Sequence, residues 1–240
     1  MPSSRETAKN RLIVALDYES LPAALRTARR LAGLVGMFKI GKQLFTAEGP
    51  RAVKQVARLG AGIFLDLKYH DIPNTVAGAV AAAAKLPGVR LVNLHTLGGR
   101  EMMRAASSAR GSKLHPKLLG VTLLTSLDEY ELARVGILGP PLKRVVALAK
   151  LARNCGLNGV VASPREASAI RRELGAKFLI VVPGVRPAGA AHGDQSRVAT
   201  AKHAITAGAD YIVVGRPITA APNPREAAGR ILDEIASALR

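Results

Sequence analysis

Residues Ile63–Thr75 read IFLDLKYHDIPNT, and this stretch shows the repeating strand–turn–helix pattern that predicts the fold. Its first part, Ile63–Leu67, is short and mostly apolar, which is typical of a buried strand. The turn His70–Pro73 follows, and the preference for extended backbone before Pro73 keeps a helix from starting earlier. The stretch therefore predicts one unit made of a strand, a turn and the beginning of a helix.

The same kind of unit recurs along the chain. Because the runs are apolar over most of their length, we expect strands buried on both faces, as parallel strands covered by helices are. Eight units in 240 residues match a TIM barrel, so we predict an α/β fold in which residues 1–240 form a single-domain (β/α)8 TIM barrel. A doubly wound open sheet is the alternative, although no Gly-x-Gly-x-x-Gly pattern follows the first run. The predicted strands are Leu12–Leu16, Met37–Ile40, Ile63–Leu67, Leu91–Leu94, Leu118–Thr122, Gly159–Ala162, Phe178–Val182 and Tyr211–Val214.

Capping residues mark two of the predicted helices. Ser163–Glu166 and Asn223–Glu226 each offer an N-cap residue, a proline at the first helical position and a glutamate at the third. Ser126–Gly156 is long for one strand–helix unit and is expected to hold an extra helix. The last helix has an apolar face at helical spacing, made of Ala227, Ile231, Leu232, Ile235 and Leu239.

The composition indicates a water-soluble protein. The apolar runs are far shorter than a bilayer requires, and the N-terminus lacks the apolar core of a signal peptide, so we predict no membrane partner and a cytoplasmic location. Cys155 is the single cysteine, which excludes an intramolecular disulfide and a cysteine-cluster metal site. We expect Cys155 to be a small buried apolar residue.

The formal net charge of +18 raises the question of a nucleic-acid partner. Aromatic residues are only 3% of the chain, so the stacking platform of a single-strand binder is missing. We therefore predict no nucleic-acid partner and a solvated, basic helix surface. Pairs of adjacent cations lie in predicted helices, as in Arg29-Arg30, Lys143-Arg144 and Arg171-Arg172.

Charged residues gather where predicted strands end. Barrel enzymes carry their chemistry at the C-terminal ends of the strands, and Asp17, Lys39, Asp66 and Lys68 all lie there. Side chains two apart on a strand point the same way, so Asp66 and Lys68 should both face the barrel mouth. Asp71 follows in the turn. Ordinary ion pairs around a barrel rim are the plainer alternative, but alternating carboxylates and ammonium groups in a concave site are costly to desolvate.

The segment DLKYHDIPNT resembles the Asp-x-Lys-x-x-Asp-Ile-Pro-x-Thr signature of the orotidine 5′-phosphate decarboxylase family, in its bacterial type. Further motifs of that family occur in order, namely VALD, FKIGKQLF, VTLLTS, VPGVRP, GDQ and VGRPIT. The resemblance implies decarboxylation of orotidine 5′-phosphate to uridine 5′-phosphate and CO2, the last step of UMP biosynthesis, without cofactor or metal. Suprafamily relatives that act on 3-keto-gulonate 6-phosphate or a hexulose phosphate, and that use Mg²⁺, share the shorter Asp-x-Lys-x-x-Asp core.

The resemblance also implies catalytic roles for four residues. Lys68 matches the proton donor to carbon 6 of the pyrimidine, and Asp66 matches the carboxylate beside the substrate's own carboxylate. Lys39 matches the lysine that bridges the charge network, and Asp17 the aspartate that binds a ribose hydroxyl.

A further group of residues is implied to act across a subunit interface. In the family, the residues that match Asp71, Ile72 and Thr75 reach into the neighbouring subunit's site. The resemblance therefore implies an active homodimer, with Asp71 counted among the catalytic residues.

The glycine- and proline-rich segment Val181–Gln195 predicts a mobile loop after the seventh strand. Loops after strands seven and eight of barrels commonly hold phosphate, so Arg186, Gln195, Gly215 and Arg216 are candidate phosphate ligands. Glycine allows close backbone approach, and arginine can grip phosphate through two parallel hydrogen bonds. The resemblance assigns phosphate binding to the same residues.

Two pairs of residues near the mouth have open assignments. Thr125 and Ser126 resemble the family's contacts to the nucleotide, but either could instead cap the next helix. His70 and His95 also lie near the mouth, where a structural hydrogen bond is the simpler role for each. No His/Glu spacing in the sequence suggests a metal site.

Overall fold

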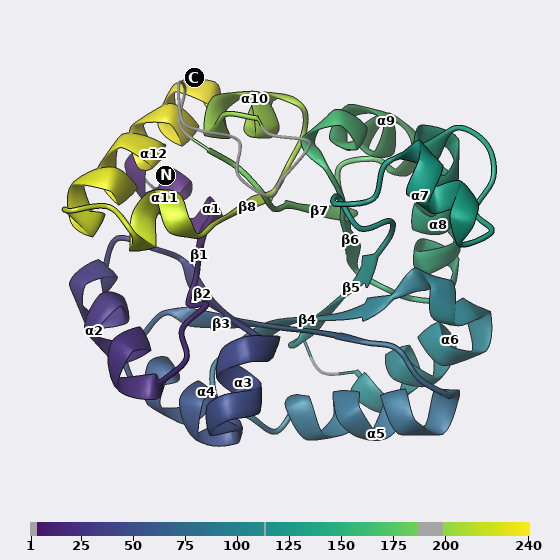
Figure 1. The fold of residues 1–240 in the computed structure, drawn as a ribbon, viewed down its shortest axis with the longest axis horizontal. Helices are drawn as coiled ribbons and strands as arrows, with labels where there is room; N and C mark the ends of the chain where they lie inside the picture. The colour runs from purple at the N-terminus through teal and green to yellow at the C-terminus, as the bar shows by residue number, and fades with distance from the viewer. Residues whose placement is uncertain (1–3, 113, 187–198) are drawn as a thin grey trace.

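The computed structural model describes residues 4–112, 114–186 and 199–240. In these residues eight parallel strands pair in chain order, and the barrel closes where the last strand pairs with the first (Figure 1). The fold is a single-domain TIM barrel, as the sequence predicts, and closure rules out the open-sheet alternative. The strands are β1 Leu12–Ala15, β2 Met37–Gly41, β3 Gly62–Tyr69, β4 Val89–His95, β5 Lys117–Val121, β6 Gly159–Val161, β7 Leu179–Val182 and β8 Tyr211–Val214.

Helices form a ring around the barrel (Figure 1). The extra helix predicted within Ser126–Gly156 is present, because both α7 and α8 lie there. Within the described ranges, none of the helices has the length and apolar character needed to cross a bilayer. The helices are α1 Ser4–Arg11, α2 Leu21–Leu31, α3 Lys42–Glu48, α4 Pro50–Ala57, α5 Pro73–Ala83, the 3-10 turn η1 Thr96–Gly98, α6 Gly99–Arg110, α7 Glu129–Arg134, α8 Pro141–Asn154, α9 Pro164–Leu174, α10 Ala201–Thr206, α11 Arg216–Thr219 and α12 Pro224–Ala238.

The predicted capping residues begin α9 and α12. The backbone N–H of Ser163 donates to the Glu166 carboxylate over 2.7 Å, and the Asn223 side chain accepts from the backbone N–H of Glu226 over 3.4 Å. The predicted face of α12 is buried from Ala227 to Ile235, and Leu239 packs half-buried just after the helix ends. Cys155 is buried and free, as predicted.

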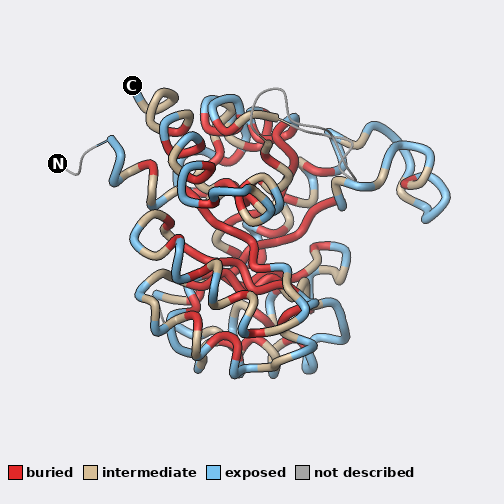
Figure 2. Tube along the Cα trace, turned by 60° about the vertical axis from the view of Figure 1, so that its left-hand side comes forward, coloured by how far each residue is buried: buried red, intermediate tan, exposed pale blue. Residues whose placement is uncertain are grey.

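The strands separate two apolar layers. Residues such as Ile13, Phe64 and Val213 fill the inside of the barrel, while Leu12 and Val14 belong to the larger layer between barrel and helices. Figure 2 shows buried residues concentrated in the middle of the molecule and exposed residues towards its outside. Because side chains alternate along a strand, residues that continue the inner register beyond the apolar layer reach the C-terminal mouth of the barrel.

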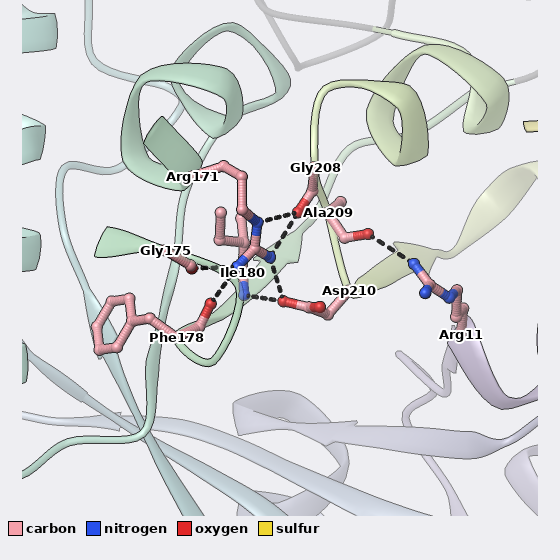
Figure 3. Close-up of polar contacts among 8 residues, drawn as sticks. All are labelled: Arg11, Arg171, Gly175, Phe178, Ile180, Gly208, Ala209 and Asp210. Carbon is pink, nitrogen blue, oxygen red and sulfur yellow. Dashed lines mark hydrogen bonds and ion pairs between the residues drawn. The ribbon is translucent and has the colours of Figure 1, made fainter. Parts of the chain in front are cut away.

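A polar clamp joins α9 to the beginning of β7 and β8 (Figure 3). The Asp210 carboxylate accepts from Arg171 and also from the backbone N–H of Ile180, over 2.8 Å, while Arg11 donates to the Ala209 carbonyl over 3.2 Å. Arg171 is therefore not one of the solvated helix cations that the sequence predicts. The partners of its guanidinium are the carbonyl oxygens of Gly208 (2.7 Å), Gly175 (2.7 Å) and Phe178 (2.8 Å) and Oδ2 of Asp210 (2.7 Å).

We predict that Arg171→Ala lowers the free energy of unfolding by about 2 kcal/mol or more, because it removes the arginine donor from three carbonyls and a half-buried carboxylate. The matched control is Arg172→Ala, whose side chain is exposed, and it should change stability by less than about 0.5 kcal/mol. Urea unfolding followed by circular dichroism measures both. Equal effects of the two substitutions would contradict the clamp.

Candidate active site

A cavity of about 330 Å³ opens at the C-terminal ends of the strands. Apolar residues of the inner layer, including Ala15, Phe64 and Val213, form part of its wall. The structure brings most of the predicted site residues together in this one cavity. Those that line it are Asp17, Lys39, Asp66, Lys68, Thr125, Arg186, Gly215 and Arg216.

Asp66 and Lys68 point into the cavity together, as the alternation along β3 predicts. The ammonium of Lys68 lies 2.6 Å from Oδ1 of Asp66, and Leu67 between them packs against the outer apolar layer. The end of β3 is irregular, because Leu65 pairs with Val92 and Tyr69 pairs with Leu94. Three residues of β3 therefore lie opposite one residue of β4, and that residue is Asn93.

Asn93 is fully buried and holds this irregular segment in place. Its side-chain oxygen accepts from the backbone N–H of Lys68 over 2.8 Å, and its amide nitrogen donates to Oδ1 of Asp66 over 2.7 Å. Lys68 has φ of 51°, the left-handed region that a non-glycine residue adopts at a cost of about 1–3 kcal/mol. The hydrogen bonds of Asn93 offset part of this cost. Sequence reasoning missed Asn93, although a polar residue inside the apolar run LVNL was a visible signal.

Lys39 connects the two aspartates of the cluster. Its ammonium lies 2.8 Å from Oδ1 of Asp17 and 3.4 Å from Oδ2 of Asp66. Gly41, two residues further along the same face of β2, leaves room for this pair, because a Cβ there would lie 2.8 Å from the Lys39 ammonium and 3.0 Å from the Asp17 carboxylate. Gly41 is a second residue that the sequence analysis did not single out.

The cations around Asp66 decide its ionisation. Asp66 is only 8% exposed, and burial by itself raises the pKa of a carboxyl group. The charges of Lys39 and Lys68 outweigh burial, with hydrogen bonds from Lys68 and Asn93 adding to them, so that the pKa of Asp66 falls below its ordinary value. The carboxylate is therefore ionised at neutral pH, and the cluster is a chain of alternating charges from Asp17 to Lys68.

Several predicted site residues lie outside the cavity. Asp71, Ile72 and Thr75 are exposed, and Ile72 is 67% exposed although it is apolar. The Asp71 carboxylate accepts from the backbone N–H of Ile72 over 2.6 Å. Gln195 lies outside the described residues, as does most of the loop predicted after β7.

Ser126 is exposed and does not line the cavity. The capping role considered for it is wrong, because Asp128 is the N-cap of α7 and accepts from the backbone N–H of Glu131 over 2.8 Å. Thr125 does line the cavity.

The opposite wall of the cavity carries the arginines. Arg186 follows β7 and Arg216 follows β8, and Gly215 lies between the end of β8 and Arg216. The Nε–H of Arg186 is buried and has no hydrogen-bond partner among the described residues. A Cβ at Gly215 would meet only Ala15, 3.7 Å away, so this backbone faces open space. An anion bound at this wall would satisfy the buried donor.

His70 and His95 contact one another beside the cluster, with ring centroids 5.2 Å apart. Burial, followed by the charges of His70, Lys42 and Lys68, lowers the pKa of His95 to about 4. His95 is therefore neutral at pH 7. Within the part of the chain that the structure describes, no group of three or more His, Cys, Asp or Glu side chains is placed to hold a metal ion.

Comparison with known proteins identifies the family. The family model described as "Orotidine 5'-phosphate decarboxylase / HUMPS family" matches residues 10–231, which is nearly the whole chain. The chain belongs to this family. Membership in the orotidine 5′-phosphate decarboxylase / HUMPS family makes it an enzyme, and the match spans every strand of the barrel.

Individual members of the family are similar over almost their full length. A protein of Trichlorobacter lovleyi named orotidine 5'-phosphate decarboxylase is 52% identical over 241 residues, covering 99% of this chain and 100% of its own. One of the same name from Pelobacter propionicus is 53% identical, covering 97% and 98%. The crystal structure of orotidine 5'-phosphate decarboxylase from Lactobacillus acidophilus superposes with a TM-score of 0.80 at 37% identity, covering 93% of this chain and 98% of that one.

We predict that Lys39→Met raises the pKa of Asp66, because it removes the first of the two cations that oppose burial. The measurement is a pH titration of the Asp66 carboxyl carbon by 13C NMR. Lys42→Met is the matched control, since this exposed lysine is not among the groups that shift Asp66. An unchanged pKa in Lys39→Met would show that the Asp66 ionisation does not depend on Lys39.

Proposed function

We propose that this enzyme converts orotidine 5′-phosphate to uridine 5′-phosphate and CO2 without a cofactor, as the last step of UMP biosynthesis. The observation that carries the proposal is the row of alternating charges in the cavity, in which the buried Asp66 contacts both Lys68 (2.6 Å) and Lys39 (3.4 Å). The relatives that share about half of its residues over nearly the whole chain bear the name of this activity.

The decarboxylation requires electrostatic stabilisation of its transition state. When the bond between carbon 6 and the carboxylate breaks, CO2 leaves and the electron pair stays on carbon 6, where the ring offers no conjugated acceptor. An ammonium group next to carbon 6 stabilises this developing charge more than it stabilises the substrate. We assign that group to Lys68, which then transfers its proton to carbon 6 and recovers a proton from water.

The surroundings of Lys68 fit this role. Its backbone is fixed by Asn93 and its ammonium by Asp66, so little reorganisation is needed when charge develops. Because the pKa of Asp66 is lowered, its carboxylate stays charged beside the place where the substrate carboxylate would lie. Lys39 would link this end to Asp17, which we assign to a ribose hydroxyl.

The arginine wall fits the phosphate of the substrate. We assign phosphate binding to Arg186, Gly215 and Arg216, with Gln195 as a further ligand. The Nε–H of Arg186, which has no partner among the described residues, supports this assignment. Thr125 and Ser126 would contact the base. Binding energy from the remote phosphate can then be used to organise the ring end of the site.

A homodimer would complete the site. Asp71, Ile72 and Thr75 lie exposed outside the cavity of their own chain, where a partner subunit could reach them. We propose that these three residues reach the partner's site, where Asp71 would contact the partner's charged cluster.

We predict that Lys68→Ala abolishes the loss of orotidine 5′-phosphate, followed by ultraviolet absorbance, and leaves binding of uridine 5′-phosphate largely intact. The assay contains EDTA, so that a Mg²⁺-dependent reaction of the related sugar-phosphate type would not be counted. Lys54→Ala, an exposed lysine on α4, is the control and should keep full activity. Near-normal turnover by Lys68→Ala would refute the assignment.

Shared sites also predict complementation between two inactive variants. In a mixed dimer of Lys68→Ala and Asp71→Ala chains, one of the two sites combines an intact Lys68 with an intact Asp71. Random assortment of an equal mixture should therefore restore about a quarter of the activity per chain. If the mixture stays as inactive as its components, Asp71 does not act in the partner's site.

A further inference from the structure

A second, larger cavity of about 710 Å³ lies at the other end of the barrel, around the N-terminal ends of the strands. Its floor is made of inner-facing strand residues, including Met37, Leu91, Leu179 and Tyr211. None of the described residues that line this lower cavity also lines the cavity at the barrel mouth. The volume lies within the range of about 300–1,000 Å³ typical of small-molecule sites.

The rim of this lower cavity is strongly basic. Among the described residues, five cations and one histidine line it, and none of the described lining residues is Asp or Glu. Lys117, Arg153 and Lys177 form no ion pair with any described residue, and Lys9 pairs only with Glu6, 3.3 Å away. The basic residues come from separate parts of the chain, namely Lys9, Arg90, His115, Lys117, Arg153 and Lys177.

The nearest acidic side chains along the chain do not neutralise this rim. Asp210, next to Tyr211, is held by Arg171 over 2.7 Å. Glu173, next to Leu174, is paired with Lys150 over 2.6 Å. Neither Asp210 nor Glu173 therefore balances the positive charges that line the lower cavity.

His115 adds a buried donor to the same rim. Its Nε2 lies 3.4 Å from a guanidinium nitrogen of Arg90, while its Nδ1 is buried and has no partner among the described residues. Burial and the charges of Arg90 and Lys117 lower the pKa of His115, which reflects the positive field at this position. Arg90 and Lys117 line the cavity together with His115, so an anion placed there would meet several donors at once.

We propose that the lower cavity is a binding site for an organic polyphosphate of nucleotide size, separate from the decarboxylase site. The arginine and lysine groups suit phosphate oxygens, to which they give short, charge-assisted hydrogen bonds. The apolar floor with Tyr211 suits the organic part of such a ligand. A concave site of this volume fits a small molecule better than it fits a nucleic-acid backbone.

The test measures adenosine triphosphate binding by calorimetry with EDTA present, and uses the Arg186→Ala/Arg216→Ala protein so that the mouth cannot contribute. We expect one site per chain. Lys117→Met/Lys177→Met, added to that protein, should weaken binding by about tenfold or more, because two charge-assisted contacts are lost. Lys117→Arg/Lys177→Arg should retain most of the affinity, and exchange of the exposed pair Lys54→Met/Lys143→Met should leave it unchanged.

A local readout identifies the site directly. Bound triphosphate should protect Lys117 and Lys177 from acetylation, as measured by mass spectrometry, while Lys54 stays reactive. The proposal is overturned if affinity disappears with the mouth arginines, if the methionine variant binds as tightly as its parent, or if a short DNA duplex competes as well as the triphosphate does. None of these outcomes depends on turnover, so failure here is distinguishable from failure of the decarboxylase assignment.

Discussion

The arrangement of this molecule depends on the two-residue period of its strands, which decides what enters the barrel and what faces the helices. On β3 the inner positions change along the strand from Phe64, which is apolar, to Asp66 and Lys68, which are charged. Polar chemistry is thereby confined to the mouth, above a layer of apolar side chains. A shift of β3 by one residue would turn the charges of Asp66 and Lys68 towards the helices, where no partner would offset the cost of their desolvation.

The two-residue period of β3 is interrupted at the charged cluster. Three residues of β3 face Asn93 alone, and Lys68 takes a left-handed backbone that regular pairing would not allow. A hydrogen bond from Lys68 to Asn93 replaces the missing ladder bond, and Asp66 is satisfied from the same side chain. Local strain at the site is thus held by a fully buried amide, and stability elsewhere rests on regular layers and on contacts such as the Arg171 clamp.

Much of this could be predicted from sequence, because apolar runs and alternation are local properties. They gave the barrel, the convergence of Asp17, Lys39 and Asp66, and the extra helix before β6. They could not give Asn93, whose role depends on a mismatch between two strands, or Arg171, whose partners lie up to 39 residues away. The lower basic cavity was equally hidden, since segments from α1 to β8 contribute to it and only the closed barrel brings them together.

The apolar layer inside the barrel has a consequence for how the two ends communicate. Phe64 and Val213 belong to the mouth cavity, Met37 and Leu91 to the lower one, and these side chains pack together into a single cluster. The inside of the barrel is therefore filled by packed side chains, and water and solutes at one end have no path along its axis to the other. Each cavity exchanges with bulk solvent independently of the other. Binding at one cavity can affect the other only through the packed apolar cluster between them or through the electric field.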